Sequence, residues 1–280
     1  MFKDLLVPMT ASAGDMDALN VALDLAASQG AHLSVLELVN LPLPLASPWG
    51  LMPDITAMEA YAPLRELGEH NVAKLKARLA KETVSNEVRL VESLFVEPAR
   101  MAAHCAHYAD LTVVAGAIGD TAEAAVPHAF FGSLLLESGR PVLVVPPRCK
   151  TPMPPRRVVA AWRPTTECAR ALHDALPLLI SADAVDLLVV DPSGGERGHG
   201  EQPGVDIATH LARHGVKVNV VVRESKRSSI SEVLLEHARE MRPDLLVAGG
   251  YGHSRLREWA LGGVTRELLI GATIPVFFSH

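Results

Sequence analysis

The chain has 280 residues, of which 49% are hydrophobic and 21% charged, and its formal net charge is −6. The negative charge argues against general nucleic-acid binding, and no apolar run of about 18 residues predicts a membrane span. Three widely spaced cysteines form no CxxC pair, so neither a disulfide framework nor a zinc site is indicated. Because the first residues do not resemble a signal peptide, we expect a cytoplasmic protein that binds neither nucleic acid nor a membrane.

In the first half, short apolar runs alternate with helical patterns, which is typical of βαβ units and a parallel sheet. The Pro-rich stretch Asn40–Pro53 is predicted to be a surface loop at the edge of the sheet, either a lid or a plain insertion. In chain order we expect a strand at Asp4–Met9, a helix at Met16–Ser28, a strand at His32–Val39, an amphipathic helix, a strand at Glu87–Leu94, a helix at Ala99–Tyr108 and strands within Ala109–Gly116 and Arg140–Pro146.

The second half repeats this pattern. Its predicted strands are Arg157–Trp162, Val185–Val190, Lys217–Val222, Leu245–Ala248 and one within Thr273–Phe278, and its predicted helices are Thr166–Ile180, an amphipathic helix, Ile230–Glu240 and Arg266–Ile270. The fold class is therefore α/β, with two tandem doubly wound domains of five parallel strands each. We place the domains at residues 1–147 and 156–280, joined by a stiff Pro-rich linker at 148–155.

A glycine-spaced segment follows the strand Leu245–Ala248. Glycines let a backbone approach a ligand closely, and a helix that starts after them offers unpaired N–H groups and the positive end of its dipole. The segment therefore predicts a phosphate cradle, or alternatively a turn that needs glycine only for its geometry. It comprises Gly249, Gly252, a basic loop with His253, Ser254, Arg255 and Arg257, then Gly262, Gly263 and Thr265.

On these residues the chain resembles the universal stress protein family in its tandem, two-domain form. The family signature is a Gly, two residues, a Gly, nine residues and a Gly, which Gly249, Gly252 and Gly262 match. The resemblance spans essentially the whole chain. It implies Rossmann-like domains similar to adenine nucleotide alpha hydrolases, pairing through the last strands and, in many members, adenine-nucleotide binding. The nucleotide contacts that it implies are Val189, Gly249, Gly252, His253, Ser254, Gly262, Gly263, Val264 and Thr265, with Arg163 as a further candidate.

Two positions of the second half depart from the family pattern. Gly263 stands where the family has Ser or Thr, so a hydroxyl contact to phosphate is lost while the backbone N–H remains. Arg163 stands where nucleotide-binding relatives carry an Asp for a ribose hydroxyl, and the first half has Thr10 there. Arg163 could contact phosphate, point to solvent or pair with an acid, and the sequence leaves these alternatives open.

The glycine pattern of the first half is altered. Twelve residues separate Gly119 from Gly132, where the signature has nine, and the stretch Asp120–Phe131 is acidic and apolar. Acidic residues repel phosphates. We expect this half to be empty or altered, with a mainly structural or pairing role.

Two histidine pairs, His104 with His107 and His210 with His214, have helical spacing. Zinc needs three or four ligands in tetrahedral geometry, and neither pair has an HExxH arrangement. We interpret both pairs as solvated helix faces and predict no protein metal site.

Together these features predict a stress-response protein that binds an adenine nucleotide, with ATP as the first candidate, in its second domain as a signalling module. Magnesium is expected only as a companion of the phosphates, because the sequence shows no dedicated set of carboxylates that would bind it directly. No nucleophile or general base can be named. The alternatives are a nucleotide-free dimeric scaffold for protein partners and a slow ATP hydrolase. The last strands, Val142–Val145 and Val276–Phe278, are expected to pair within the chain, and a homodimer is left open.

Overall fold

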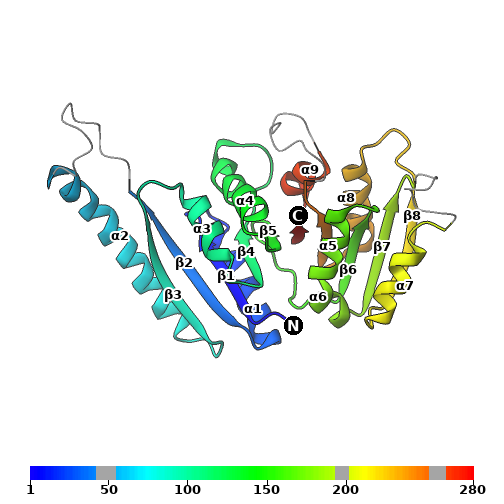
Figure 1. The fold of residues 1–280 in the computed structure, drawn as a ribbon, viewed down its shortest axis with the longest axis horizontal. Helices are drawn as coiled ribbons and strands as arrows, with labels where there is room; N and C mark the ends of the chain where they lie inside the picture. Colours follow the sequence, from blue (N-terminus) through cyan, green and yellow to red (C-terminus); the bar gives the residue numbers. More distant parts are fainter. Residues whose placement is uncertain (42–54, 193–201, 252–262) are drawn as a thin grey trace.

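A computed structural model describes residues 1–41, 55–192, 202–251 and 263–280 (Figure 1). Within these residues, ten strands form one sheet in the order β3-β2-β1-β4-β5-β10-β9-β6-β7-β8. The strands of the first half are β1 (Asp4–Met9), β2 (His32–Asn40), β3 (Asn86–Ser93), β4 (Leu111–Ala115) and β5 (Val142–Val145). Those of the second half are β6 (Arg157–Trp162), β7 (Ala184–Val190), β8 (Val218–Arg223), β9 (Leu245–Gly249) and β10 (Val276–Ser279).

The two halves share one strand order, because β8-β7-β6-β9-β10 repeats β3-β2-β1-β4-β5. Neighbouring strands within each half are parallel. β5 and β10 pair antiparallel across the junction, with Leu143 opposite Phe277. The predicted α/β fold with doubly wound parallel sheets is therefore confirmed, and the proposed domain bounds stay a prediction.

Helices cover both faces of the sheet (Figure 1). They are α1 (Asp15–Gln29), α2 (Ile55–Leu79), α3 (Pro98–Ala106), α4 (Ala125–Glu137), α5 (Thr166–Asp174), α6 (Leu176–Ser181), α7 (Val205–Arg213), α8 (Ile230–Met241) and α9 (Val264–Gly271), with a short 3₁₀ turn at Ala122–Ala124. One core lies between the sheet and α1, α2, α5, α6 and α7, and the other between the sheet and α3, α4, α8 and α9. No described helix is long and apolar enough to cross a membrane.

Each core runs through both halves of the molecule. In β5, Leu143 and Val145 join one core while Val142 and Val144 join the other, since successive side chains of a strand point to opposite faces. β10 alternates in the same way, with Phe277 in the first core and Phe278 in the second. The runs of consecutive apolar residues in these strands are therefore explained by burial on both faces.

Two helices differ from the prediction. The expected helix Thr166–Ile180 is divided into α5 and α6, and Pro177 lies in the first turn of α6, where a missing N–H is tolerated. The second difference lies in the acidic and apolar stretch Asp120–Phe131, for which no helix was predicted: α4 begins at Ala125, and Gly132 lies within it. The altered glycine pattern of the first half therefore does not form a loop of the signature type.

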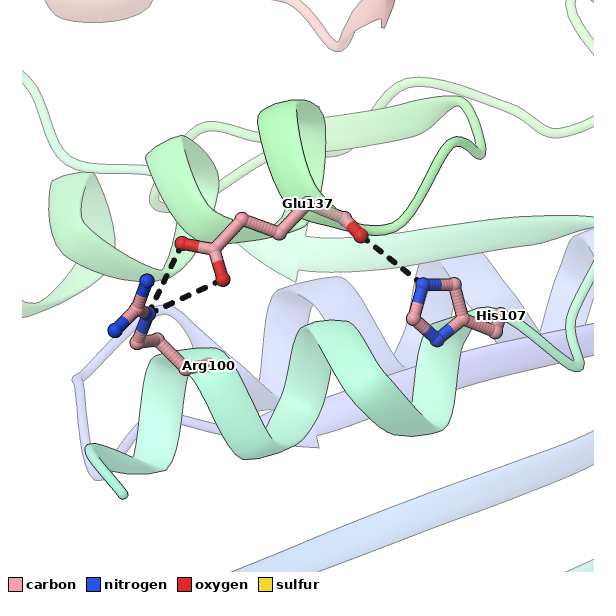
Figure 2. A network of polar contacts seen from close by, with 3 residues as sticks. All are labelled: Arg100, His107 and Glu137. Atoms are coloured by element: carbon pink, nitrogen blue, oxygen red, sulfur yellow. Dashed lines mark hydrogen bonds and ion pairs between the residues drawn. The ribbon is translucent and has the colours of Figure 1, made fainter.

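Polar contacts fasten the end of α4 to α3 (Figure 2). The Arg100 guanidinium forms an ion pair with the Glu137 carboxylate at 3.1 Å, and His107 Nε2 lies 3.0 Å from the Glu137 carbonyl oxygen. His104 and His107 are both exposed, as the sequence predicted, but the His107 ring is also held by this contact.

Candidate functional site

In the second half, strand order reverses between β6 and β9. After β6 the chain enters α5 on one face of the sheet, whereas α9 packs on the opposite face. Open α/β sheets bind ligands beyond the carboxyl ends of their strands at such a reversal, because the diverging helices leave a crevice there. The described residues at this point are Arg163 and Thr165 after β6, Gly249 to Tyr251 at the end of β9, and Gly263 to Thr265 at the start of α9.

Gly249 is required by the protein's own packing. A Cβ atom at Gly249 would lie 2.7 Å from the backbone nitrogen of Cys168 and 2.8 Å from the carbonyl carbon of Glu167. The first turn of α5 therefore fits against the end of β9 only because residue 249 has no side chain. The glycine predicted as a ligand contact has a structural reason of its own.

The two described flanks of the glycine loop are tied together. The Tyr251 N–H donates to Thr265 Oγ1 at 3.0 Å, and Thr265 is buried. Tyr251 itself has a left-handed backbone with φ of 43°, and burial raises the pKa of its phenol, while nearby Arg266 lowers it. The Thr265 hydroxyl, predicted to contact phosphate, therefore accepts a hydrogen bond from the residue that follows β9. The hydroxyl proton of Thr265 can still be donated to a ligand.

The start of α9 is open. Gly263 is the exposed N-cap residue of α9 and has no side-chain cap, and no atom of the described residues lies within 4 Å of the place a Cβ atom would take there. The first N–H groups of a helix lack partners inside the helix. Gly263 and Val264 therefore present backbone donors at the crevice, and a larger residue would fit at position 263.

The β6 side supplies a cation and a well-formed helix start. Arg163 is exposed, and its guanidinium has no hydrogen bond or ion pair with another described residue. The Thr165 side chain caps α5 by accepting the Cys168 N–H. Of the three alternatives left open for Arg163, pairing with a described acid is not observed, and the guanidinium is available to an anion.

Val189 is completely buried near the end of β7. A Cβ atom on Gly204, which precedes α7, would lie 3.1 Å from Val189 Cγ2, so the Val189 side chain belongs to the core. Just beyond β7, Asp191 accepts the Ser225 N–H at 2.8 Å, and hydrogen bonds from Ser225 lower the pKa of its carboxyl group. Any ligand contact at Val189 must come from its backbone.

Four predicted site residues lie outside the described residues: Gly252, His253, Ser254 and Gly262. Their contacts with a ligand stay a prediction. Among the residues that are described, no group of three or more His, Cys, Asp or Glu could hold a metal ion.

The corresponding strand reversal of the first half, between β1 and β4, carries acidic side chains. Asp15, at the first position of α1, is 7% exposed and accepts the N–H of Thr10 at 2.9 Å and its hydroxyl at 2.6 Å. Burial raises the pKa of Asp15, and burial also raises that of Glu37, which the nearby Asp15 charge raises further. Glu37 pairs with Met9 across β1 and β2, as Val189 pairs with Trp162 across β6 and β7. A carboxylate thus stands at the position that corresponds to the expected adenine contact.

Sequence reasoning missed the role of Asp15. The available signal was a Thr10-x-Ser12 pair followed three residues later by an Asp, a pattern in which short polar side chains bond locally ahead of a helix. Attention to the end of β1 identified Thr10 but not the carboxylate that it contacts.

Comparisons with known proteins agree with this architecture. Residues 155–280 match the Universal stress protein family. Universal stress protein Slr1230 of Synechocystis sp. is 24% identical over 235 residues, covering 79% of this chain and 78% of that protein. A universal stress protein structure from Archaeoglobus fulgidus covers 99% of this chain and 95% of its own, at 14% identity and a TM-score of 0.69.

A functionally unknown protein from Pseudomonas aeruginosa PAO1, PA1789, has the same fold over 99% of this chain and 92% of its own, at 14% identity and a TM-score of 0.58. At these identities the solved structures establish the fold of the chain and nothing about its ligand.

Proposed function

We propose that this chain, whose residues 155–280 match the universal stress protein family and whose first half repeats the same strand order, binds an adenine nucleotide in its second half. ATP is the first candidate, and the protein acts as a binding and signalling module in a stress response.

The observation that supports this proposal is the open start of α9 at the strand reversal. Gly263 and Val264 offer N–H groups there without a capping side chain, and no described residue fills the space beside Gly263 where a phosphate would lie. Helix N-termini favour anions through both these donors and the helix dipole. The guanidinium of Arg163, which has no partner among the described residues, adds positive charge across the reversal, where phosphates would lie.

The first half supports the assignment by contrast. The corresponding strand ends carry Asp15 and Glu37 in place of an arginine, and most of its altered glycine segment is helical. Negative charge disfavours phosphates, so a single nucleotide per chain is expected.

The described residues fit a nucleotide in part. Backbone amides at Gly263 and Val264 would hold phosphate oxygens, the Val189 backbone would face the adenine, and Gly252, His253, Ser254 and Gly262 would complete the cradle. Magnesium would be held by the phosphates themselves, since no described cluster of side chains could bind it. The missing ribose-binding Asp at Arg163 implies modest affinity.

The test is mass spectrometry of small molecules released from the freshly purified protein, followed by calorimetric titration of the stripped protein with ATP and AMP. Bound or titratable adenine nucleotide that is lost in Gly252→Val is the expected result. Arg163→Glu should weaken ATP binding about fivefold or more, because it reverses the charge at the crevice. Arg156→Glu is the matched control, since Arg156 is exposed at the opposite end of the same strand.

A nucleotide-free dimeric scaffold is the second candidate, favoured by the two departures at Arg163 and Gly263. If the native chain binds no nucleotide but the double variant Arg163→Asp, Gly263→Ser does, the native site is lost and the scaffold function is the better account. Slow ATP hydrolysis would be excluded by turnover that is the same in the native chain, Gly252→Val and Thr265→Ala.

A further inference from the structure

The β9 flank of the glycine loop packs on the first half of the chain. The Tyr251 ring lies 6.2 Å, between ring centroids, from Phe131 of α4. Gly250 lies so close to the same helix that a Cβ atom there would be 2.6 Å from Leu135 Cδ2. The residues through which the chain leaves β9 therefore rest on α4.

The α9 flank of the loop is also attached to the first half. The Gly119 N–H donates to the Ile270 carbonyl oxygen at 2.9 Å, near the end of α9. At the start of the helix, the Arg266 guanidinium forms an ion pair with the Asp120 carboxylate. Both ends of α9 are therefore fastened to one turn of the first half, Gly119–Asp120.

Tyr251 is the residue where these contacts matter most. Its left-handed backbone, with φ of 43°, is unfavourable for a residue with a side chain, and such conformations persist only where surrounding contacts hold them. Those contacts are the Phe131 ring on one side and Thr265 Oγ1, which accepts the Tyr251 N–H, on the other. The direction in which the chain enters the glycine loop thus depends on a residue of the first half.

α4 is itself held in place, by burial of the side chains that face the β9 flank and by polar contacts to α3. Phe131 and Leu135 are almost completely buried, at 0% and 2% exposure. The far end of the helix is tied to α3 through Arg100, His107 and Glu137 (Figure 2).

We propose that α4 and the Gly119–Asp120 turn of the first half position the two described flanks of the glycine loop of the second half, the end of β9 and α9, with Phe131 as the principal positioning residue. The nature of the ligand rests on the proposed function; the positioning itself rests on the contacts. The segment of the first half that follows Gly119 thus supports the residues on either side of the glycine loop.

The test compares Phe131→Leu with Phe130→Leu in the full chain. Phe130 is 5% exposed in the same helix and core, and among the described residues it makes no ring contact with Tyr251, so the control makes the same substitution while the ring contact to Tyr251 stays in place. Hydrogen–deuterium exchange of the ligand-free protein reports the Tyr251 amide. The Gly250 amide, bonded to the Ser279 carbonyl oxygen at 2.8 Å, is the internal reference. ATP affinity is then measured by calorimetry.

We expect Phe131→Leu to accelerate Tyr251 exchange about fivefold or more and to weaken ATP binding by a similar factor, with little change at Gly250 or in Phe130→Leu. Native exchange at Tyr251 in Phe131→Leu, or equal acceleration in both variants, would overturn the positioning role. If exchange responds as expected while the native chain binds no ATP, the positioning role stands and the proposed nucleotide function fails.

Discussion

The glycines of the candidate site differ in what surrounds them, and therefore in whether a side chain could be accommodated at each position. The spacing of Gly249, Gly252 and Gly262 identified the family resemblance, yet the sequence could not show what lies against each position. Gly249 faces the backbone of α5, Gly250 faces the flexible end of Leu135, and Gly263 faces no atom of the described residues within 4 Å. Such differences depend on tertiary approach between distant segments, which no local pattern contains.

This contrast gives a paired prediction. Gly249→Ala should lower the free energy of unfolding by about 1–3 kcal/mol, because its Cβ would overlap the α5 backbone, which cannot move aside as a side chain can. Gly263→Ala adds the same methyl group where no described atom lies within 4 Å, and it should change the free energy of unfolding by about 0.5 kcal/mol or less. Urea unfolding of both variants checks this, and equal losses would contradict the packing role of Gly249.

The buried carboxyl group of Asp15 predicts a pH dependence. Burial raises its folded-state pKa above 3.8, more than the hydrogen bonds from Thr10 and Ser12 lower it. Between the unfolded and the folded pKa of Asp15, the folded state therefore binds more protons than the unfolded state. The contribution of the protonated Asp15 to the free energy of unfolding is present at low pH and is lost as pH rises through the folded pKa. In Asp15→Asn the free energy of unfolding should fall less between about pH 4 and pH 7. Unfolding curves across this range with the same slope as the native chain would contradict this account.

At the scale of elements, the sequence predicted the strands well, but it missed α4 and did not show that α5 and α6 are separate helices. β1 and β6 have the predicted bounds, because short apolar runs buried on both faces have no competing arrangement. α4 was not predicted, because the stretch was compared only with the glycine signature, although Ala122, Ala124 and Ala125 are strong helix formers and Pro127 lies in the first helical turn, where proline is tolerated.

The start of α8 offers a prediction at this scale. Ser229 and Glu232 form a capping box, and the Ser229 hydroxyl also lies 3.3 Å from the Glu267 carboxylate of α9. Ser229→Ala should lower the free energy of unfolding by about 0.5–2 kcal/mol, because a helix N–H loses its acceptor. Ser228→Ala, at an exposed neighbouring position, is the control, and an equal loss there would show that the cap is unimportant.

At the scale of the whole molecule, the pairing of β5 with β10 joins the halves into one sheet. The sequence predicted that the last strands would pair, since each is an apolar edge, but it could not show that both cores would continue across the junction. That continuity depends on which side chains alternate to which face at an antiparallel contact, and on helices from both halves meeting there. Because β5 and β10 pair with each other, a homodimer, which is still a prediction, would have to use a surface other than these last strands. The edges that remain unpaired in the described sheet are β3 and β8.

Continuous cores imply that the halves unfold together. Phe278 is completely buried in β10, and its ring lies 5.0 Å, between centroids, from that of Phe131 in the first half. Phe278→Ala should lower the free energy of unfolding by about 3–5 kcal/mol and shift one cooperative transition that far-ultraviolet circular dichroism and tryptophan fluorescence report alike. Phe95→Ala, at a side chain that is 73% exposed, makes the same substitution at little cost. Two transitions in Phe278→Ala, with one unmoved from the native curve, would mean that the halves are independent. In that case the first half could not position the end of β9 and the helix α9, the two flanks of the glycine loop, through α4 and the shared sheet.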